Sequence, residues 1–488
     1  MQPPPPVTPI FLIARPHRAL ARLAHRSLRA FLPWLLALLL APAGASGAPL
    51  PPAVDSALRA AGIAPQDIAI VVRGVDAGAP LLSHNARRAM NPASTMKLVT
   101  TYAGLELLGP AHRWKTEALS EAPPVAGRLA GNLYLRGSGD PKLTLEQFWL
   151  LLRQLRVRGI AEIDGDLVLD RSAFAVPPHD PAEFDGEALR PYNAGPDALL
   201  VNLKSVRLTL QPDPARKAVA VLAETPGLRV DNRLRLGQGS CGDWRERFQV
   251  SVDDETVRLD GDFPAACGEK ALHLAPWPAD AQVDRLFRAL WHELGGTLRG
   301  TVRPGTTPDA AGLVVAQDSP PLGEIVRDIN KYSNNVMARQ LFLSLAAERP
   351  ATPEGARRRV ADWLAGKSLQ LPELVLDNGS GLSRAERISA AGLGDLLLAA
   401  WRSPVMPELM ASLPLAGVDG TLKKRLGDSP AAGRAHLKTG YLEGVRALAG
   451  YVLDGSGKRW VVVCLINGPR AQAGKPAMDA LLRWVAER

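Results

Sequence analysis

Three short motifs follow one another along this chain, and their order and spacing constrain its fold more than any other feature. They are Ser94-Thr-Met-Lys97, Ser333-Asn-Asn335 and Lys438-Thr-Gly440. The 239 residues from Ser94 to Ser333 leave room for extra domains between the first two motifs. If the three act on one substrate, two far-separated parts of the chain must fold into one domain.

The first motif pairs a nucleophile with a base one helical turn away. Residues i and i+3 share a helix face, and a serine hydroxyl needs a base within hydrogen-bond reach. Asn91 suits an N-cap and Pro92 the first helical position, which places Ser94 in the first turn with its own N–H available to an oxyanion. Lys97 acts as a base only when neutral, and burial beside Lys438 would lower its pKa accordingly. The alternative is a capping serine beside a surface lysine.

The second motif lies between two predicted helices. In the functional interpretation Ser333 relays a proton between the lysines and a leaving amine, and the Asn335 amide holds a substrate carbonyl. The alternative is a simple helix N-cap at Ser333 or Asn334.

The third motif lies on a predicted strand. The Lys438 cation would attract a carboxylate, Gly440 would let a substrate backbone approach, and the Tyr441 N–H would be the second oxyanion donor. The alternative is a strand end that runs into a turn. Taken together, the three motifs indicate acyl transfer through a serine ester.

The expected elements place the motifs in a discontinuous α/β domain. A β-hairpin precedes the Ser94 helix, and strands followed by a helix close the chain. Residues 116–312 instead hold many short β-like runs between Gly, Asp and Pro turns. We therefore expect a catalytic domain of residues 49–115 and 313–488, with helices flanking an antiparallel sheet, interrupted by one or two mostly-β accessory domains over 116–312. The expected strands are 68–73, 81–83, 435–441, 445–453 and 460–466, and the expected helices are 322–330, 334–346, 353–365 and 476–488.

Residues 1–45 have the pattern of a secretory signal peptide. Five arginines precede the apolar run Phe31–Leu40, and Ala43-Gly-Ala45 offers a cleavage site. The run is short for a spanning helix, and an uncleaved anchor is the alternative. Cleavage removes five arginines and no acids, so the formal net charge falls from +9 to +4. This mildly basic surface suits an anionic polymer such as cell wall and is too weak to indicate nucleic acid.

The cysteines are compatible with export. Cys241 and Cys267 lie 26 residues apart and could form a disulfide, whereas Cys464 sits in a strand-like run as a small buried hydrophobe. No pair of cysteines or histidines has metal-ligand spacing, and His292-Glu293 lacks the second histidine of a zinc-protease motif. We expect no metal and no cofactor.

The motif set is that of penicillin-binding proteins and class A β-lactamases. A compact β-lactamase has far less chain between its motifs. The sequence therefore resembles the low-molecular-mass class C penicillin-binding proteins, the D-alanyl-D-alanine carboxypeptidase/endopeptidase family S13, which is penicillin-binding protein 4-like. Further stretches that resemble this family along nearly all of the mature chain are Gly131–Pro141, Asp377–Arg384, Gly417–Leu422 and Gly444–Gly450.

The resemblance implies a penicillin-binding/β-lactamase-like transpeptidase domain and assigns roles to the motif residues. Ser94 would be the acylated nucleophile and Lys97 its base, with Ser333, Asn335 and Lys438 also catalytic. The substrate-binding residues would be Thr439, Gly440 and Tyr441. Two positions depart from the family: Ser-Asn-Asn replaces the common Ser-Asp-Asn, and Tyr441 replaces a Thr or Ser, which leaves Thr439 to bind a terminal carboxylate. The run Asp377–Arg384 is first a tight turn, and its serines would border the site without taking part in the chemistry.

The function implied is that of an exported, periplasmic serine DD-peptidase. It would cleave D-Ala-D-Ala or D-Ala-meso-diaminopimelate bonds in peptidoglycan stem peptides, and β-lactams would acylate the same serine. The alternatives are a β-lactamase, for which no second base is evident, and a non-catalytic wall-binding protein that works through its inserted domains. The balance of carboxypeptidase and endopeptidase activity, and the oligomeric state, stay open.

Overall fold

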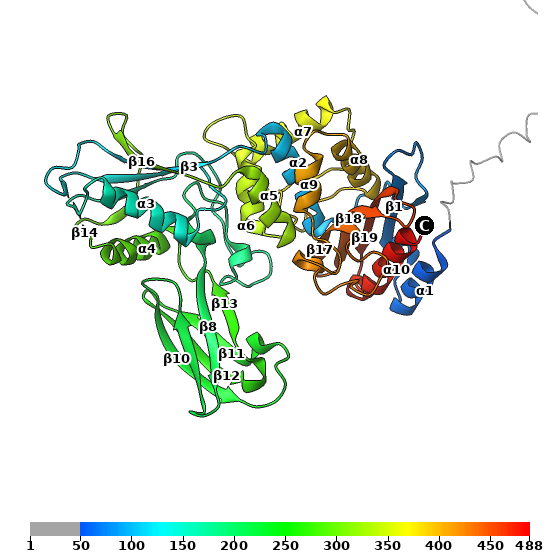
Figure 1. The fold of residues 1–488 in the computed structure, drawn as a ribbon, viewed down its shortest axis with the longest axis horizontal. Helices are drawn as coiled ribbons and strands as arrows, with labels where there is room; N and C mark the ends of the chain where they lie inside the picture. Colours follow the sequence, from blue (N-terminus) through cyan, green and yellow to red (C-terminus); the bar gives the residue numbers. More distant parts are fainter. Residues whose placement is uncertain (1–48) are drawn as a thin grey trace, which may run out of the picture. The chain divides into compact units, whose positions relative to one another are not determined.

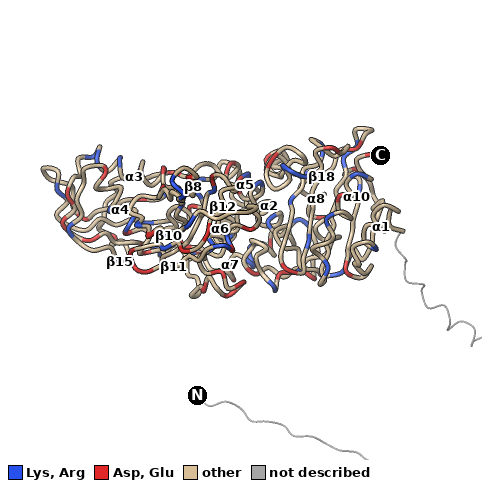
Figure 2. Tube along the Cα trace, turned by 90° about the horizontal axis from the view of Figure 1, so that it is seen from below, with Lys and Arg blue, Asp and Glu red and all other residues tan. Residues whose placement is uncertain are grey.

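The computed structural model describes residues 49–488. The predicted signal peptide, residues 1–45, lies outside this range. Within it, no helix combines the length and apolar character needed to cross a membrane. Basic and acidic residues are interspersed over the described chain (Figure 2).

One five-stranded sheet joins the two ends of the described chain. Its order is β17-β18-β19-β1-β2, and every neighbouring pair is antiparallel. Ile68 pairs with Ile466, so the first strand lies against the last (Figure 1). The strands are β1 (Ile68–Gly74), β2 (Leu82–His84), β17 (Ala435–Leu442), β18 (Val445–Leu453) and β19 (Arg459–Asn467). The predicted hairpin and closing strands are confirmed.

Helices cover both faces of this sheet, as the alternation of β1 shows. Ile68, Ile70 and Val72 pack in the core with α1 (Pro52–Ala61) and α10 (Lys475–Ala486). Ala69 and Val71 belong to the opposite core, which includes residues of α2 and α8. Because both faces are buried, β1 and β19 read as continuous apolar runs. The helices on the second side are α2 (Lys97–Leu107), α5 (Leu322–Lys331), α6 (Asn335–Ser344), α7 (Pro353–Gly366), α8 (Ala390–Trp401) and α9 (Met406–Ser412).

Helix α2 is buried on every side. The sequence pattern predicts one buried face that includes Val99, Tyr102 and Leu105, yet every residue from 97 to 105 is buried. The reason is that α2 lies among α5, α6, α7 and α9 on the sheet's second side. Lys97 is thereby removed from water.

Residues 116–312 contribute to further sheets with their own cores. A five-stranded sheet has the order β15-β7-β5-β3-β16, a six-stranded sheet the order β11-β12-β10-β9-β8-β13, and a three-stranded sheet the order β14-β6-β4. Strand β3 (Lys115–Ser120) pairs with β16 (Gly312–Asp318), so the chain enters and leaves this region on adjacent strands. The other strands are β4 (Arg128–Leu129), β5 (Leu133–Gly137), β6 (Glu162–Ile163), β7 (Leu167–Asp170), β8 (Val206–Asp213), β9 (Ala218–Ala223), β10 (Arg229–Gly237), β11 (Phe248–Val252), β12 (Thr256–Pro264), β13 (Lys270–Leu274), β14 (Thr297–Leu298) and β15 (Val302–Pro304).

Two helices in this region were not predicted. They are α3 (Leu145–Val157) and α4 (Ala279–Glu293), and their apolar faces share one core with strands β5 and β7. The short β-like runs around them dominate the sequence pattern and mask the helical periodicity. The division into domains at 116 and 312 stays a prediction.

The cysteines behave as expected. Cys241 and Cys267 form a disulfide at the edge of the core of the six-stranded sheet. Cys464 is a free, buried thiol in β19.

Candidate active site

Ser94 lies in a 3₁₀ turn, Ala93–Met96, that leads directly into α2. The turn begins one residue later than predicted, because Pro92 and not Asn91 is its N-cap. The Asn91 side chain accepts the Ala93 N–H at 2.8 Å and thereby anchors the turn. Asn467, at the end of β19, accepts the Asn91 N–H at 2.7 Å and ties the turn to the central sheet. Ala93 has φ +44°, a conformation that costs energy for a residue with a Cβ. The fold therefore holds the Ser94 backbone in a set position.

Lys97 has three oxygen neighbours. Its Nζ lies 3.1 Å from Ser94 Oγ and 2.6 Å from Asn335 Oδ1, and it also donates to the Ser380 carbonyl. The lysine is fully buried. The first and second motifs thus meet at one amine, as the sequence predicts.

Burial lowers the pKa of both lysines of the site. The pKa of Lys97 lies well below its usual value, chiefly because of desolvation and secondly because of the charge of Lys438. Burial alone lowers the pKa of Lys438 to about 7. A charge on Lys438 opposes a proton on Lys97, so the site favours the neutral form of Lys97.

Ser333 and Lys438 form the second half of the network. Lys438 Nζ donates to Ser333 Oγ at 2.8 Å and to the Thr439 carbonyl at 2.8 Å. Ser333 has φ +57° in the short link between α5 and α6. Asn334 is the N-cap, because its side chain accepts the Met337 N–H at 3.0 Å. That capping role leaves Ser333 available to Lys438.

The backbone of β17 presents a free edge beside these groups. The Leu437 N–H donates to the Pro414 carbonyl, away from β18. Backbone groups alternate in direction along an antiparallel strand, so the Thr439 and Tyr441 N–H groups point the same way. Strand β17 is the last of its sheet, so a substrate backbone can pair with this edge. The Tyr441 side chain is 58% exposed and its ring lies 4.3 Å from the Arg446 guanidinium.

Gly440 has a packing role that the sequence did not predict. A Cβ at this position would lie 2.8 Å from the Pro92 carbonyl oxygen and 3.0 Å from the Ala93 Cβ. The missing side chain therefore lets β17 pack against the turn of Ser94. The expected role of Gly440, close approach of a substrate backbone, stays a prediction.

The run Asp377–Arg384 borders the site, as predicted, and it also contains contacts that the sequence did not reveal. The Ser380 carbonyl accepts from Lys97, and a Cβ at Gly381 would collide with the Ala93 carbonyl. The fully buried Glu386 accepts the N–H groups of residues 377, 378 and 379 at 3.4, 3.2 and 3.0 Å. Burial raises the pKa of Glu386 to about 7. The sequence signal for Glu386 is an acidic residue that follows a turn-rich segment.

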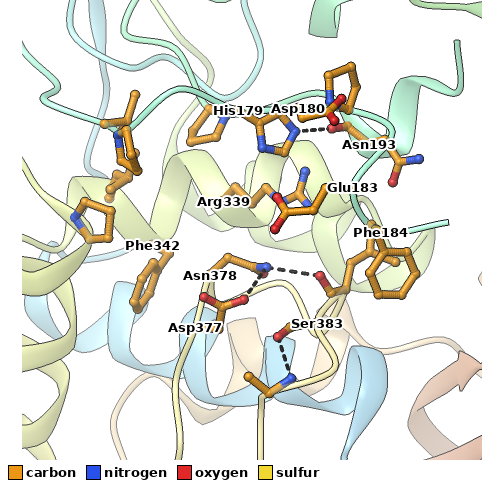
Figure 3. A pocket seen from close by; sticks show the side chains of 18 of the residues that line it. His179, Asp180, Glu183, Phe184, Asn193, Arg339, Phe342, Asp377, Asn378 and Ser383 are labelled. Atoms are coloured by element: carbon orange, nitrogen blue, oxygen red, sulfur yellow. Dashed lines mark hydrogen bonds between the residues drawn. The ribbon is translucent and has the colours of Figure 1, made fainter. Parts of the chain in front are cut away.

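A pocket of about 460 Å³ adjoins the turn of Ser94. Ser383 lines it, and the Ser383 carbonyl accepts from the Asn91 side chain at 2.8 Å. Figure 3 shows Arg339 of α6 facing a segment that carries Asp180 and Glu183. Positive and negative side chains thus share one cavity. Among residues 49–488, no group of three His, Cys, Asp or Glu side chains is arranged to hold a metal ion.

Known proteins match this chain over most of its length. The model of the D-Ala-D-Ala carboxypeptidase 3 (S13) family matches residues 50–488. A D-alanyl-D-alanine carboxypeptidase of Actinomadura sp. (strain R39) is 30% identical over 437 residues, which are 86% of this chain and 81% of that protein.

Solved structures agree with the sequence match. The crystal structure of penicillin-binding protein 4 from Haemophilus influenzae superposes with a TM-score of 0.73 at 25% identity, covering 88% of this chain and 99% of that one. The same protein complexed with a β-lactam gives a TM-score of 0.70 at 25% identity, with the same coverage. The expected transpeptidase-like fold with accessory domains is confirmed. Because the family model spans nearly all described residues, the chain belongs to the D-Ala-D-Ala carboxypeptidase 3 (S13) family of serine-type carboxypeptidases.

Proposed function

We propose that the chain is an exported DD-peptidase that cleaves peptidoglycan stem peptides after a D-alanine through an ester on Ser94. The observation that carries this proposal is the surroundings of Lys97. A buried amine lies 3.1 Å from the Ser94 hydroxyl, and its pKa is lowered. A serine so placed can be deprotonated as it attacks.

The neighbours of Lys97 orient its lone pair. A neutral amine has two N–H donors and one lone pair, and two of its three neighbours are the Asn335 and Ser380 carbonyl oxygens, which only accept. When both N–H groups bond to these oxygens, the lone pair is left for the Ser94 hydroxyl. Asn335 therefore positions the base, in addition to any contact with substrate.

The proton taken from Ser94 has to reach the leaving amine. In acylation the Ser94 oxygen forms a bond to the substrate carbonyl carbon, and the carbon–nitrogen bond breaks. We assign Ser333, which is 2.8 Å from Lys438 Nζ, to pass a proton to the departing nitrogen. Water then attacks the ester, releases the shortened peptide and returns the proton to Ser94.

Two backbone N–H groups would stabilise the oxyanion, those of Ser94 and Tyr441. The Tyr441 N–H lies on the free edge of β17, and Gly440 lets this strand approach the turn of Ser94. The neighbouring cavity, with Arg339 among carboxylates, suits a substrate side chain that carries both charges, such as meso-diaminopimelate.

We propose further that residues 1–45 direct the protein to the periplasm, where its polymeric substrate lies, and that residues 116–312 are accessory. The separate hydrophobic cores of that region support this division. A β-lactam would acylate Ser94, and the complex of the Haemophilus protein with such a compound supports this.

The test is acylation by labelled penicillin followed by digestion of defined muropeptides. We expect wild type to be labelled and to release D-alanine from a pentapeptide, and Ser94→Ala to do neither. Separation of the two peptides of a cross-linked muropeptide would show that the protein is also an endopeptidase. Labelling that persists in Ser94→Ala would contradict the proposal, and rapid turnover of a chromogenic cephalosporin would favour a β-lactamase instead.

A further inference from the structure

A loop formed by residues 375–387 reaches the general base of the site. Its ends pair through two backbone hydrogen bonds, at 2.9 and 3.1 Å. Between these ends, the Ser380 carbonyl accepts from Lys97 Nζ. The neighbouring Gly379 carbonyl accepts from the Thr100 hydroxyl at 2.6 Å. Because Lys97 and Thr100 share one face of α2, two successive carbonyl groups bind the loop to the helix that carries the base.

The Glu386 side chain holds this loop from within. One of its carboxyl oxygens accepts the N–H groups of three successive residues, 377, 378 and 379, at 3.4, 3.2 and 3.0 Å. Successive N–H groups that converge on one oxygen form a nest, an arrangement suited to a carboxylate. The nest ends at Gly379, and the next residue, Ser380, supplies the carbonyl to Lys97. The position of that carbonyl therefore depends on Glu386.

The loop needs such an anchor because glycines flank Ser380 on both sides. Gly379 has φ +70° and Gly381 has φ +78°. A Cβ at Gly379 would lie 2.7 Å from Phe342 Cγ, and a Cβ at Gly381 would collide with the Ala93 carbonyl, so larger residues do not fit. Glycine has the widest choice of backbone conformations. Without the bonds to Glu386, this part of the loop could adopt others, and the Ser380 carbonyl would move.

The second carboxyl oxygen of Glu386 is unusual. It is buried and has no hydrogen-bond partner among residues 49–488. Such an oxygen lowers stability, because it loses its bonds to water and gains none from the protein. Stability alone therefore does not explain a carboxyl at this position, whereas its bonds to the loop that contacts Lys97 connect it with the chemistry.

A displaced Ser380 carbonyl would change what Lys97 can do. A neutral amine has two N–H groups, and the Ser380 carbonyl and the Asn335 side chain accept one each. If the carbonyl moves away, the freed N–H has Ser94 Oγ, 3.1 Å from Nζ, as the remaining one of its three oxygen neighbours. The lysine would then donate to the serine instead of accepting its proton.

We propose that Glu386 is a positioning residue for the general base: its carboxyl oxygen holds the loop so that the Ser380 carbonyl takes one N–H of Lys97 and leaves the lone pair for the Ser94 hydroxyl. This inference rests on the proposed function, because it assumes that Lys97 deprotonates Ser94. Glu386 acts through the loop backbone. It sets the rate of the acylation step and not the affinity for the compound that acylates.

The experiment compares acylation by labelled penicillin in wild type and three variants. Glu386→Ala removes the accepting oxygen, and Glu386→Gln keeps one. Asp170→Ala is the matched control, because Asp170 is a buried carboxylate of β7 that accepts two backbone N–H groups, at 3.0 and 2.8 Å, away from the loop. Rates at a series of penicillin concentrations give the first-order rate constant of acylation and the half-saturating concentration.

We expect Glu386→Ala to lower the first-order rate constant by roughly 10- to 100-fold, the effect of a misplaced catalytic group, and to change the half-saturating concentration by less than about threefold. Glu386→Gln should keep the rate constant within about threefold of wild type, because it still accepts the N–H groups. Asp170→Ala should change neither quantity.

A second pair of variants tests the loop if Glu386→Ala does not fold. Thr100→Val keeps the shape of the side chain and removes the hydroxyl that binds the Gly379 carbonyl, whereas Thr100→Ser keeps the hydroxyl. We expect Thr100→Val to lower the first-order rate constant by roughly 3- to 10-fold, the effect of one neutral hydrogen bond, and Thr100→Ser to retain it.

The outcomes separate the two proposals. If penicillin does not label wild type, or still labels Ser94→Ala, the proposed function is wrong and this inference with it. If wild type is labelled at Ser94 and both Glu386→Ala and Thr100→Val react at the wild-type rate, Glu386 does not position the base and the proposed function stands. Equal losses in Glu386→Gln and Glu386→Ala would also overturn the inference, because the charge and not the accepting oxygen would then matter. The same holds for a loss confined to the half-saturating concentration or shared by Asp170→Ala.

Discussion

Replacing Glu386 by glutamine should change how the stability of the catalytic region depends on pH. Glu386 is fully buried, and burial raises its pKa from the ordinary 4.5 to about 7. Between these values the unfolded chain releases the proton while the folded protein keeps it, so wild-type stability falls as pH rises. Over pH 5 to 8 this loss is about 2 to 3 kcal/mol, since one pKa unit is about 1.4 kcal/mol.

Glu386→Gln removes this loss and retains an oxygen that can accept the three backbone N–H groups. The variant should therefore gain stability relative to wild type between pH 5 and pH 8. For a region of this size the gain corresponds to roughly 5 to 10 °C in Tm, at about 2–4 °C per kcal/mol.

The assay is thermal unfolding of wild type and Glu386→Gln at pH 5 and pH 8, with the two Tm differences compared. Glu293→Gln, at an exposed position of α4, is the control and should show the same difference at both pH values. If Glu386→Gln also shifts Tm equally at pH 5 and pH 8, Glu386 does not hold its proton to near neutral pH, and the reasoning from burial fails.

Three other outcomes test the geometry of the site and the disulfide. Gly440→Ala should slow acylation by labelled penicillin more than tenfold, because the added Cβ displaces the nucleophile's turn at a cost of roughly 1–3 kcal/mol; an unchanged rate would show that the strand and the turn are not in tight contact. The acylation rate should fall at acid pH as Lys97 gains its proton and should reach its plateau well below pH 10.5, since the pKa of Lys97 is well below that usual value; a rate that keeps rising through pH 10 would contradict this. Replacing Cys241 and Cys267 by serine should destabilise the six-stranded sheet by about 2–4 kcal/mol in denaturant unfolding and leave acylation intact; loss of acylation would mean that this sheet supports the active site.

For the active site, the motif residues could be predicted from the sequence, but the long-range contacts of Lys97 and Gly440 could not. The three motifs were evident because each is local: a serine and a lysine three residues apart share a helix face wherever the helix lies. The Ser380 carbonyl at Lys97 could not be predicted, because a backbone oxygen has no sequence signature. Gly440 was recognised as necessary, but its packing against the turn of Ser94 was not predicted, because the atoms that exclude a side chain belong to residues almost 350 positions away.

For the fold too, elements with a clear local pattern were predicted and elements that depend on distant contacts were not. The strands at both ends of the chain were predicted from their apolar runs, and helix α6 was predicted at residues 334–346. Helices α3 and α4 were not, because their apolar faces meet a sheet that the local pattern does not reveal.

By itself, the sequence determined which groups are available for chemistry and which segments form strands or helices near them, since those depend on neighbours a few residues apart. The tertiary structure decided how far the pKa values of Lys97, Lys438 and Glu386 are shifted from their usual values. Desolvation and contact between distant segments exist only after the chain has folded around them.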